Sequence, residues 1–198
     1  KLSSETKGQD LKLTIGVRSA KKGENIITLD KQERNIDNSM LVITEGGRPI
    51  ALAGVMGGAS TEVSKDTKDI ILEAAIFDPV TVRNSYKTLG LRTEAAIRFE
   101  KGIDWFLPEQ ALARTAELIT QIAAGKIVCD IVKSSIADPL PIEFIVELDY
   151  INQLLGQEFS FKEAVEILTS LSIEVQKIED RQDVFIVKIP SWRHDLKI

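Results

Sequence analysis

The sequence predicts an α+β fold, with a mixed-sheet module followed by a small winged-helix-like α/β domain. Strand patterns dominate the first part of the chain, and clear helix signals follow them. Beyond a segment rich in serine and proline, the pattern of strands and helices starts again. A chain of 198 residues with 43% hydrophobic residues can build two small cores of this kind.

The first part of the chain contains several short apolar segments that we interpret as strands. Leu11, Leu13, Ile15 and Val17 alternate with other residues, which is the periodicity of a strand. The runs 40–44 and 50–55 flank a segment with two glycines and a proline, which predicts a hairpin with a longer loop, 45–49. We also expect strands at 26–29, 70–75 and 127–132.

Two helices are predicted between these strands. Asp78 and Pro79 suit the N-cap and the first turn of a helix that Gly90 ends. A longer helix begins at Pro108 and stops at Gly125. Its apolar residues recur at the spacing of one helix face: Leu112, Ala116, Ile119 and Ala123.

The second module begins after a predicted linker, 133–141. We expect a strand at 142–148, a short helix capped by Asp149, and a second helix that starts with the capping box Ser160-x-x-Glu163. Strands at 173–178 and 184–189 then form a two-stranded wing. The predicted domains are therefore 1–132 and 142–198.

Charge and composition exclude several classes of protein. The net charge is −5, whereas a protein that neutralises many phosphates is usually basic, so we expect local RNA contacts at most and no DNA binding. No apolar run reaches the roughly 20 residues that span a bilayer, and no signal peptide is visible. We expect a cytoplasmic fragment of a longer chain. Cys129, the single cysteine, is expected to be buried and inert.

Three groups of residues are candidates for a site. Glu73 interrupts an apolar run, so it is either an outward-facing carboxylate or the acceptor of a ligand hydroxyl in a pocket. Gly54, Gly57 and Gly58 indicate a tight turn and also allow a ligand to approach the backbone. The segment Arg92-Thr93-Glu94-Ala95 follows a helix stop, where threonine is usually a cap.

Two further groups have a structural and a functional interpretation. The basic residues Arg83, Lys87, Arg92 and Arg98 form either a solvated face or a contact for RNA phosphates. In the segment 192–195, Trp192 is expected to pack against the wing, and Arg193 to pair with Asp195. His194 is the only histidine, and no serine elbow occurs, so covalent catalysis is not expected.

In their order along the chain, these motifs resemble the editing module of the bacterial phenylalanyl-tRNA synthetase beta subunit. The resemblance implies that Gly57, Glu73, Thr93 and Ala95 bind the substrate. Glu73 and Thr93 would be the catalytic residues, Glu73 by sensing the tyrosine hydroxyl and Thr93 by donating a hydrogen bond to the ester or to water. Ala96 departs from the family, which usually has serine there.

The same resemblance implies cofactors and partners for the parent enzyme. The enzyme would join phenylalanine to tRNA(Phe) with ATP and Mg²⁺, as a heterotetramer of two alpha and two beta subunits. The ATP site would lie in the alpha subunit. Asp195 would be one of several acidic residues associated with Mg²⁺, and alone it makes a poor site.

The implied reaction is hydrolysis of tyrosine wrongly attached to tRNA(Phe), with water as the nucleophile. An apolar slot shaped for phenylalanine rejects an added hydroxyl only weakly, so a second site that binds the hydroxyl is needed. The alternatives are a freestanding or vestigial editing-like domain, a tRNA-binding or structural scaffold, and a DNA-binding winged helix. The acidic charge argues against the last.

Overall fold

The α+β class is confirmed in a computed structural model, which describes residues 2–3, 14–134, 139–179 and 181–196. The chain forms two compact units, residues 1–136 (unit 1) and 137–198 (unit 2). The boundary falls inside the segment 133–141 that the sequence predicts as a linker. Of the first predicted strand, Leu11 and Leu13 lie outside the described residues.

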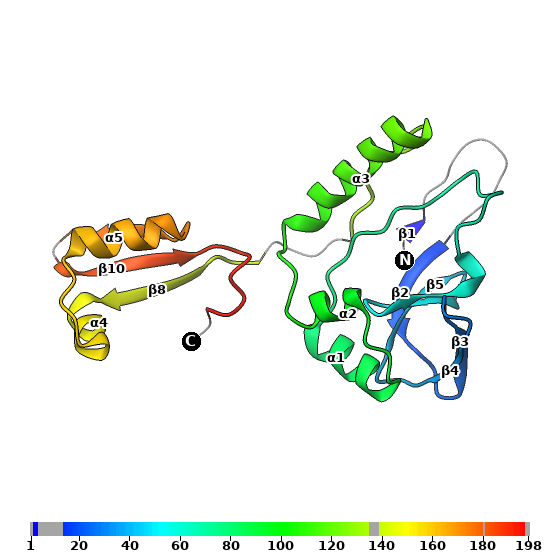
Figure 1. Ribbon diagram of the computed structural model, residues 1–198, viewed down its shortest axis with the longest axis horizontal. Helices are drawn as coiled ribbons and strands as arrows, with labels where there is room; N and C mark the ends of the chain where they lie inside the picture. The colour runs from blue at the N-terminus through cyan, green and yellow to red at the C-terminus, as the bar shows by residue number, and fades with distance from the viewer. Residues whose placement is uncertain (1, 4–13, 135–138, 180, 197–198) are drawn as a thin grey trace. The chain divides into compact units, whose positions relative to one another are not determined.

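Unit 1 is built on a five-stranded sheet in the order β1-β2-β5-β6-β7 (Figure 1). Every pairing recorded among its described strands is antiparallel, so the expected mixed sheet is wrong. Parallel strands need long crossovers, usually helical, whereas here the helices follow the strands of the unit. The strands are β1 (Leu2–Ser3), β2 (Thr14–Ser19), β5 (Leu41–Glu45), β6 (Arg48–Leu52) and β7 (Met56–Gly57).

The hairpin between β5 and β6 is tighter than the sequence suggests. Its loop is Gly46-Gly47, and both glycines have positive φ, +55° and +92°. Two-residue loops of this kind match the twist of antiparallel strands and favour glycine. The predicted longer loop, 45–49, is therefore wrong, because Glu45 and Arg48 are paired strand residues.

A separate ribbon of β3 (Glu24–Ile27) and β4 (Glu33–Ile36) connects β2 to β5. Arg18 on β2 binds both carboxylate oxygens of Glu24, at 2.6 and 2.9 Å, and the Gly47 carbonyl at 2.7 Å. These hydrogen bonds connect the sheet, the ribbon and the β5–β6 turn. The hydrogen bonds from Arg18 also lower the pKa of Glu24 to about 2.

Two helices lie next to each other beside the sheet (Figure 1). Helix α1 (Pro79–Thr88) begins as expected, because the Asp78 side chain accepts a hydrogen bond from the Thr81 amide. It buries Val82 and Tyr86 in the core of unit 1. Helix α2 (Glu94–Phe99) contributes Ala96 to the same core. A short 3₁₀ turn, η1 (Ala59–Thr61), follows β7 in the chain.

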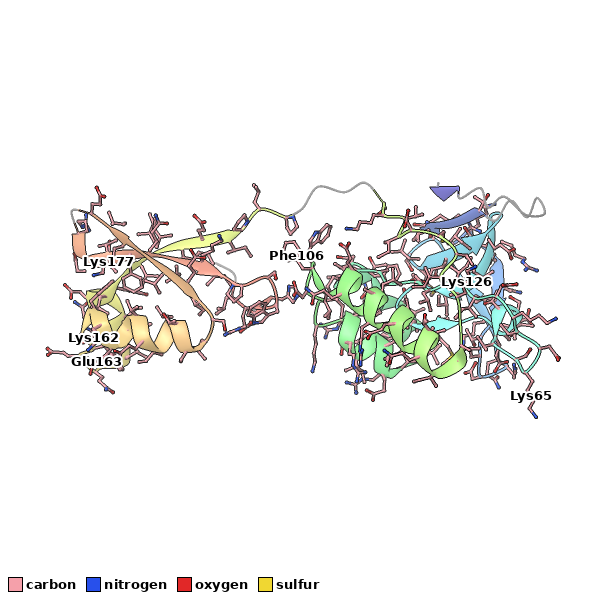
Figure 2. All side chains as sticks on the ribbon, turned by 90° about the horizontal axis from the view of Figure 1, so that it is seen from above. Lys65, Phe106, Lys126, Lys162, Glu163 and Lys177 are labelled. Atoms are coloured by element: carbon pink, nitrogen blue, oxygen red, sulfur yellow. The ribbon has the colours of Figure 1, made fainter. Side chains whose placement is uncertain are left out.

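The longer helix α3 (Leu107–Ala123) forms where the sequence predicts it, but it buries none of its residues among those described. Figure 2 shows Phe106 and Lys126 near its two ends. The segments 70–75 and 127–132 are not strands, contrary to expectation, because neither pairs with a described strand. Several of their side chains are exposed: Ile70, Ile71, Ile127, Val128, Ile131 and Val132.

Cys129 lies in the second of these segments and is exposed, so the expected buried thiol is wrong. Among the described residues, no helix is both long enough and apolar enough to cross a bilayer.

Unit 2 has a three-stranded antiparallel sheet in the order β8-β10-β9, with two helices between β8 and β9 in the chain. Its core contains Phe185, which is fully buried and meets the Phe161 ring edge to face, with 5.4 Å between the ring centroids. The elements are β8 (Ile142–Glu147), α4 (Leu148–Leu155), α5 (Phe161–Ser170), β9 (Glu174–Ile178) and β10 (Arg181–Ile189).

The helix boundaries of unit 2 follow the predicted capping signals with one exception. The capping box of Ser160 and Glu163 is confirmed at the start of α5. Gly156 ends α4 with a φ of +66°. Asp149 is not the cap of α4, because it lies in the first turn and Glu147 occupies the N-cap position.

Candidate functional site

A cavity of about 630 Å³ in unit 1 brings the three candidate groups of the sequence together. Gly54 and Gly57, Glu73, and the segment 93–95 all line it. Most of the remaining wall is apolar and includes Leu29, Ile43, Met56, Phe77, Phe99, Ile103 and Leu107. A mostly apolar concave surface with few polar groups is the usual form of a small-molecule site.

Glu73 is the polar group of this cavity with the most unusual environment. Its segment is irregular rather than a buried strand, and the residue is exposed although it lines the cavity. The surrounding protein nevertheless desolvates the carboxyl group, which raises the pKa of Glu73 above its ordinary value. No hydrogen bond or ion pair from another described residue compensates for this cost, so the carboxylate is free to accept one from a ligand.

The turn that contains Gly54, Gly57 and Gly58 (the glycine turn) has little space for side chains, and Gly54 and Gly57 also line the cavity. Gly54 has a φ of +69°, and a Cβ there would lie 2.9 Å from Val82 and 3.0 Å from Phe77. At Gly58 a Cβ would lie 2.4 Å from the Ile50 carbonyl oxygen, so close approach rather than positive φ demands glycine. Gly57 is different, because its nearest neighbour would be the cavity residue Leu29, at 3.2 Å.

The start of α2 forms another part of the cavity wall. Thr93 is its N-cap: the hydroxyl oxygen accepts from the Ala96 amide at 3.1 Å. The Thr93 hydroxyl donates to the Val55 carbonyl at 2.7 Å, so its proton is directed to the glycine turn rather than into the cavity. This pair of bonds holds the turn against α2. Ala95 lines the cavity and is exposed, whereas Ala96 is fully buried in the core.

The aromatic lining was not predictable from the motifs. Phe77 and Phe99 stand 5.2 Å apart between ring centroids, from the segments before α1 and at the end of α2. Leu29 reaches the cavity from the loop between β3 and β4, Ile103 comes from the segment before α3, and Leu107 is the first residue of α3. Only the tertiary fold brings these residues together, and no local spacing identifies them.

A second cavity, of about 450 Å³, lies beside β3, β6 and η1. Its acidic residue, Glu24, is already bound by Arg18, and the exposed Arg48 pairs with Glu45. None of the sequence candidates lines it. The first cavity is therefore the better candidate site.

The segment 192–195 does not form a metal site within the described residues. Both carboxylate oxygens of Asp195 accept hydrogen bonds from Arg193 at 2.9 Å, which lowers the pKa of Asp195 to about 2. The described part of the chain holds no cluster of three or more residues that could bind a metal. Trp192 is 54% exposed, so its expected packing is wrong, while His194 has a buried Nε2 without a recorded partner.

Comparison with known proteins places this chain in a family. Residues 8–124 match the B3/4 domain family, so the chain belongs to that family. Residues 144–198 match the model of the tRNA synthetase B5 domain. The two matches fall in unit 1 and unit 2, respectively.

Similar proteins include the phenylalanine–tRNA ligase beta subunits of three bacteria. The chain is 43% identical to that of Geobacillus kaustophilus over 184 residues and 42% identical to that of Halalkalibacterium halodurans over 187 residues. It is 44% identical to that of Protochlamydia amoebophila over 183 residues. These matches cover 92–93% of this chain but only 22–23% of the relatives. The resemblance to this subunit is confirmed.

Proposed function

We propose that this chain is the part of a phenylalanine–tRNA ligase beta subunit that hydrolyses tyrosine wrongly esterified to tRNA(Phe). The observation that carries the proposal is the apolar cavity with a single desolvated, unpaired carboxylate, Glu73. The names of the relatives support a role in the synthesis of phenylalanyl-tRNA.

Glu73 would select the substrate. The tyrosine hydroxyl donates a hydrogen bond to this carboxylate, while the ring packs against Phe77, Phe99 and the other apolar walls. Phenylalanine would fill the same walls and leave the carboxylate unpaired, which costs about 1–3 kcal/mol. This cavity would therefore prefer tyrosine to phenylalanine, which is the opposite of the preference of an apolar slot built for phenylalanine.

Water would be the nucleophile. It adds to the ester carbonyl carbon, the bond from that carbon to the ribose oxygen breaks, and the ribose oxygen takes a proton as tyrosine leaves. We assign Thr93 a positioning role, because its hydrogen bonds hold the glycine turn against the start of α2. Ala95 leaves room for the ester, and Gly57 leaves room for the ring.

The parent enzyme's other functions are part of the same proposal. It would work with an alpha subunit, two copies of each, and charge tRNA(Phe) with ATP and Mg²⁺ at the alpha-subunit site. Because Arg193 occupies both oxygens of Asp195, the described residues do not fit a magnesium site, and we derive no step through the ion.

The test is hydrolysis of tyrosyl-tRNA(Phe) by the full-length enzyme, comparing wild type with Gly57→Trp. The indole would fill the cavity beside Leu29, so we expect hydrolysis to be lost while charging with phenylalanine continues. Val63→Trp, at a 71% exposed position outside the cavity, is the matched control. Full hydrolysis by Gly57→Trp would overturn the site. Binding of the ester by wild type without hydrolysis would instead indicate a vestigial, binding-only module.

A further inference from the structure

A stretch of unit 1 is basic although the chain as a whole is acidic. Residues 79–93 contain Arg83, Lys87 and Arg92 and no carboxylate, against a net charge of −5 for the whole chain. Arg83 and Lys87 are four residues apart on α1 and so share one helix face. All three side chains are exposed.

These three cations have no acidic partner among the described residues. The nearby Arg98 differs, because it pairs with Glu94 at 3.0 Å. A surface that serves only solubility usually mixes both signs of charge. A set of unpaired cations is instead available to bind an anion.

Two of the three cations, Arg83 and Arg92, lie close enough to Tyr86 to act on it. Tyr86 donates a hydrogen bond to Glu100 at 2.6 Å, which raises the pKa of Tyr86, and Arg92 and Arg83 oppose this shift electrostatically. Both guanidinium groups therefore act on the same phenol. The acidic group beside this phenol, Glu100, is already engaged by the tyrosine.

The basic stretch is also continuous with the cavity. Phe77, two residues before α1, lines the cavity, and so does Thr93, which directly follows Arg92. Thr93, the last residue of the stretch, thus lines the cavity, Phe77 lines it two residues before the stretch begins, and the three cations between them are exposed to solvent. Glu73 within the cavity would repel a phosphate, so an anionic ligand can place only an uncharged part inside.

We propose that Arg83, Lys87 and Arg92 form a docking surface for the phosphates of a single-stranded RNA 3′ end whose esterified amino acid enters the cavity. This inference rests on the proposed function, because that function places an aminoacyl ester in the cavity. The RNA backbone must then continue outside it, where unpaired cations hold phosphates by charge-assisted hydrogen bonds.

The test uses the full-length enzyme and two non-hydrolysable probes. One is a short single-stranded RNA that carries tyrosine as a 3′ amide, and the other is the corresponding tyrosyl-amide adenosine, which has no phosphate. We expect Arg83→Ala/Lys87→Ala/Arg92→Ala to weaken RNA binding at least about tenfold and to leave nucleoside binding unchanged. For single strands each lost phosphate contact reduces the salt slope by about 0.7, so the slope should fall by about two units.

Two further variants separate charge from structure. The control Lys21→Ala/Lys22→Ala/Lys65→Ala removes three exposed cations of unit 1 that do not line the cavity, and it should bind RNA like wild type. Figure 2 shows Lys65 projecting from the unit. Arg83→Lys/Arg92→Lys keeps the charges and should retain most of the affinity.

The outcomes distinguish the docking surface from the proposed function. Equal RNA binding by the alanine variant and the control overturns the docking surface, as does wild-type enzyme that does not bind the RNA. Displacement of the RNA by poly-glutamate at equal charge would overturn it in favour of an acidic protein partner. If the variant loses RNA binding but wild type does not hydrolyse the tyrosyl ester, the surface stands and the proposed function fails.

Discussion

Glu73 is the residue on which the selectivity of the cavity depends, and its environment has a consequence for stability. Desolvation raises its pKa in the folded state, so folding favours the neutral form. The contribution of Glu73 to stability is therefore complete below its unfolded pKa and is lost as the pH rises through the higher folded value.

Replacing the Glu73 carboxyl group by an amide removes the free-energy cost of carrying a desolvated charge in the folded state, a cost that grows as the pH rises. We expect Glu73→Gln to gain stability relative to wild type between about pH 4 and pH 7, because wild type then carries a desolvated charge. The measurement is the urea midpoint of unit 1 for both proteins at each pH. A difference that is constant across this range would show that the carboxyl group is fully solvated.

Gly58 tests the packing of the glycine turn separately from function. A Cβ at this position would lie 2.4 Å from the Ile50 carbonyl oxygen, so Gly58→Ala must displace backbone. We expect a loss of about 1–3 kcal/mol in the free energy of unfolding, measured by chemical denaturation. Gly23→Ala is a control for backbone strain alone, because its positive φ is accompanied by no close contact.

Individual site residues were largely predictable from the sequence, although their bonding was not. Gly57, Glu73 and Ala95 line one cavity, as the motifs led us to expect. The sequence cannot show that the Thr93 proton goes to Val55, because that bond spans 38 residues. The roles of Gly57, Glu73, Thr93 and Ala95 in binding and hydrolysis stay predictions.

At the level of elements, the bond between Arg18 and Glu24 connects β2 to the β3–β4 ribbon. Because this bond lowers the pKa of Glu24 to about 2, its stabilisation is present above the unfolded pKa and is lost as the pH falls towards about 2. We expect Glu24→Gln to cost about 1 kcal/mol at about pH 7 and less at about pH 3. Denaturation at the two pH values measures this, and an equal cost at both would contradict the account.

Helices were predicted more reliably than strands, for a physical reason. Caps such as Asp78 and the box of Ser160 and Glu163 are local, so the sequence alone places the start of α1 and α5. A strand needs a partner edge, which local pattern does not reveal. The apolar segments 70–75 and 127–132 have no such partner among the described strands and remain irregular.

At the level of the whole molecule, the two units have separate cores that share no residue among those described. Phe185 is fully buried in unit 2, and truncation of such a residue costs about 3–5 kcal/mol. We expect Phe185→Ala to increase hydrogen exchange throughout unit 2 and to leave the strands of unit 1 protected. Loss of protection in both units would show that they fold as one.

The central claim is that Glu73 recognises the tyrosine hydroxyl, and one measurement tests it most directly. The full-length enzyme is given tyrosyl- and phenylalanyl-tRNA(Phe), and the ratio of the two hydrolysis rates is compared for wild type, Glu73→Ala and the control Glu45→Gln, which lies outside the cavity. We predict that wild type and the control prefer the tyrosyl ester. Glu73→Ala should lower the ratio about 10- to 100-fold, which corresponds to one lost hydrogen bond to a charged acceptor. An unchanged ratio in Glu73→Ala would contradict the account.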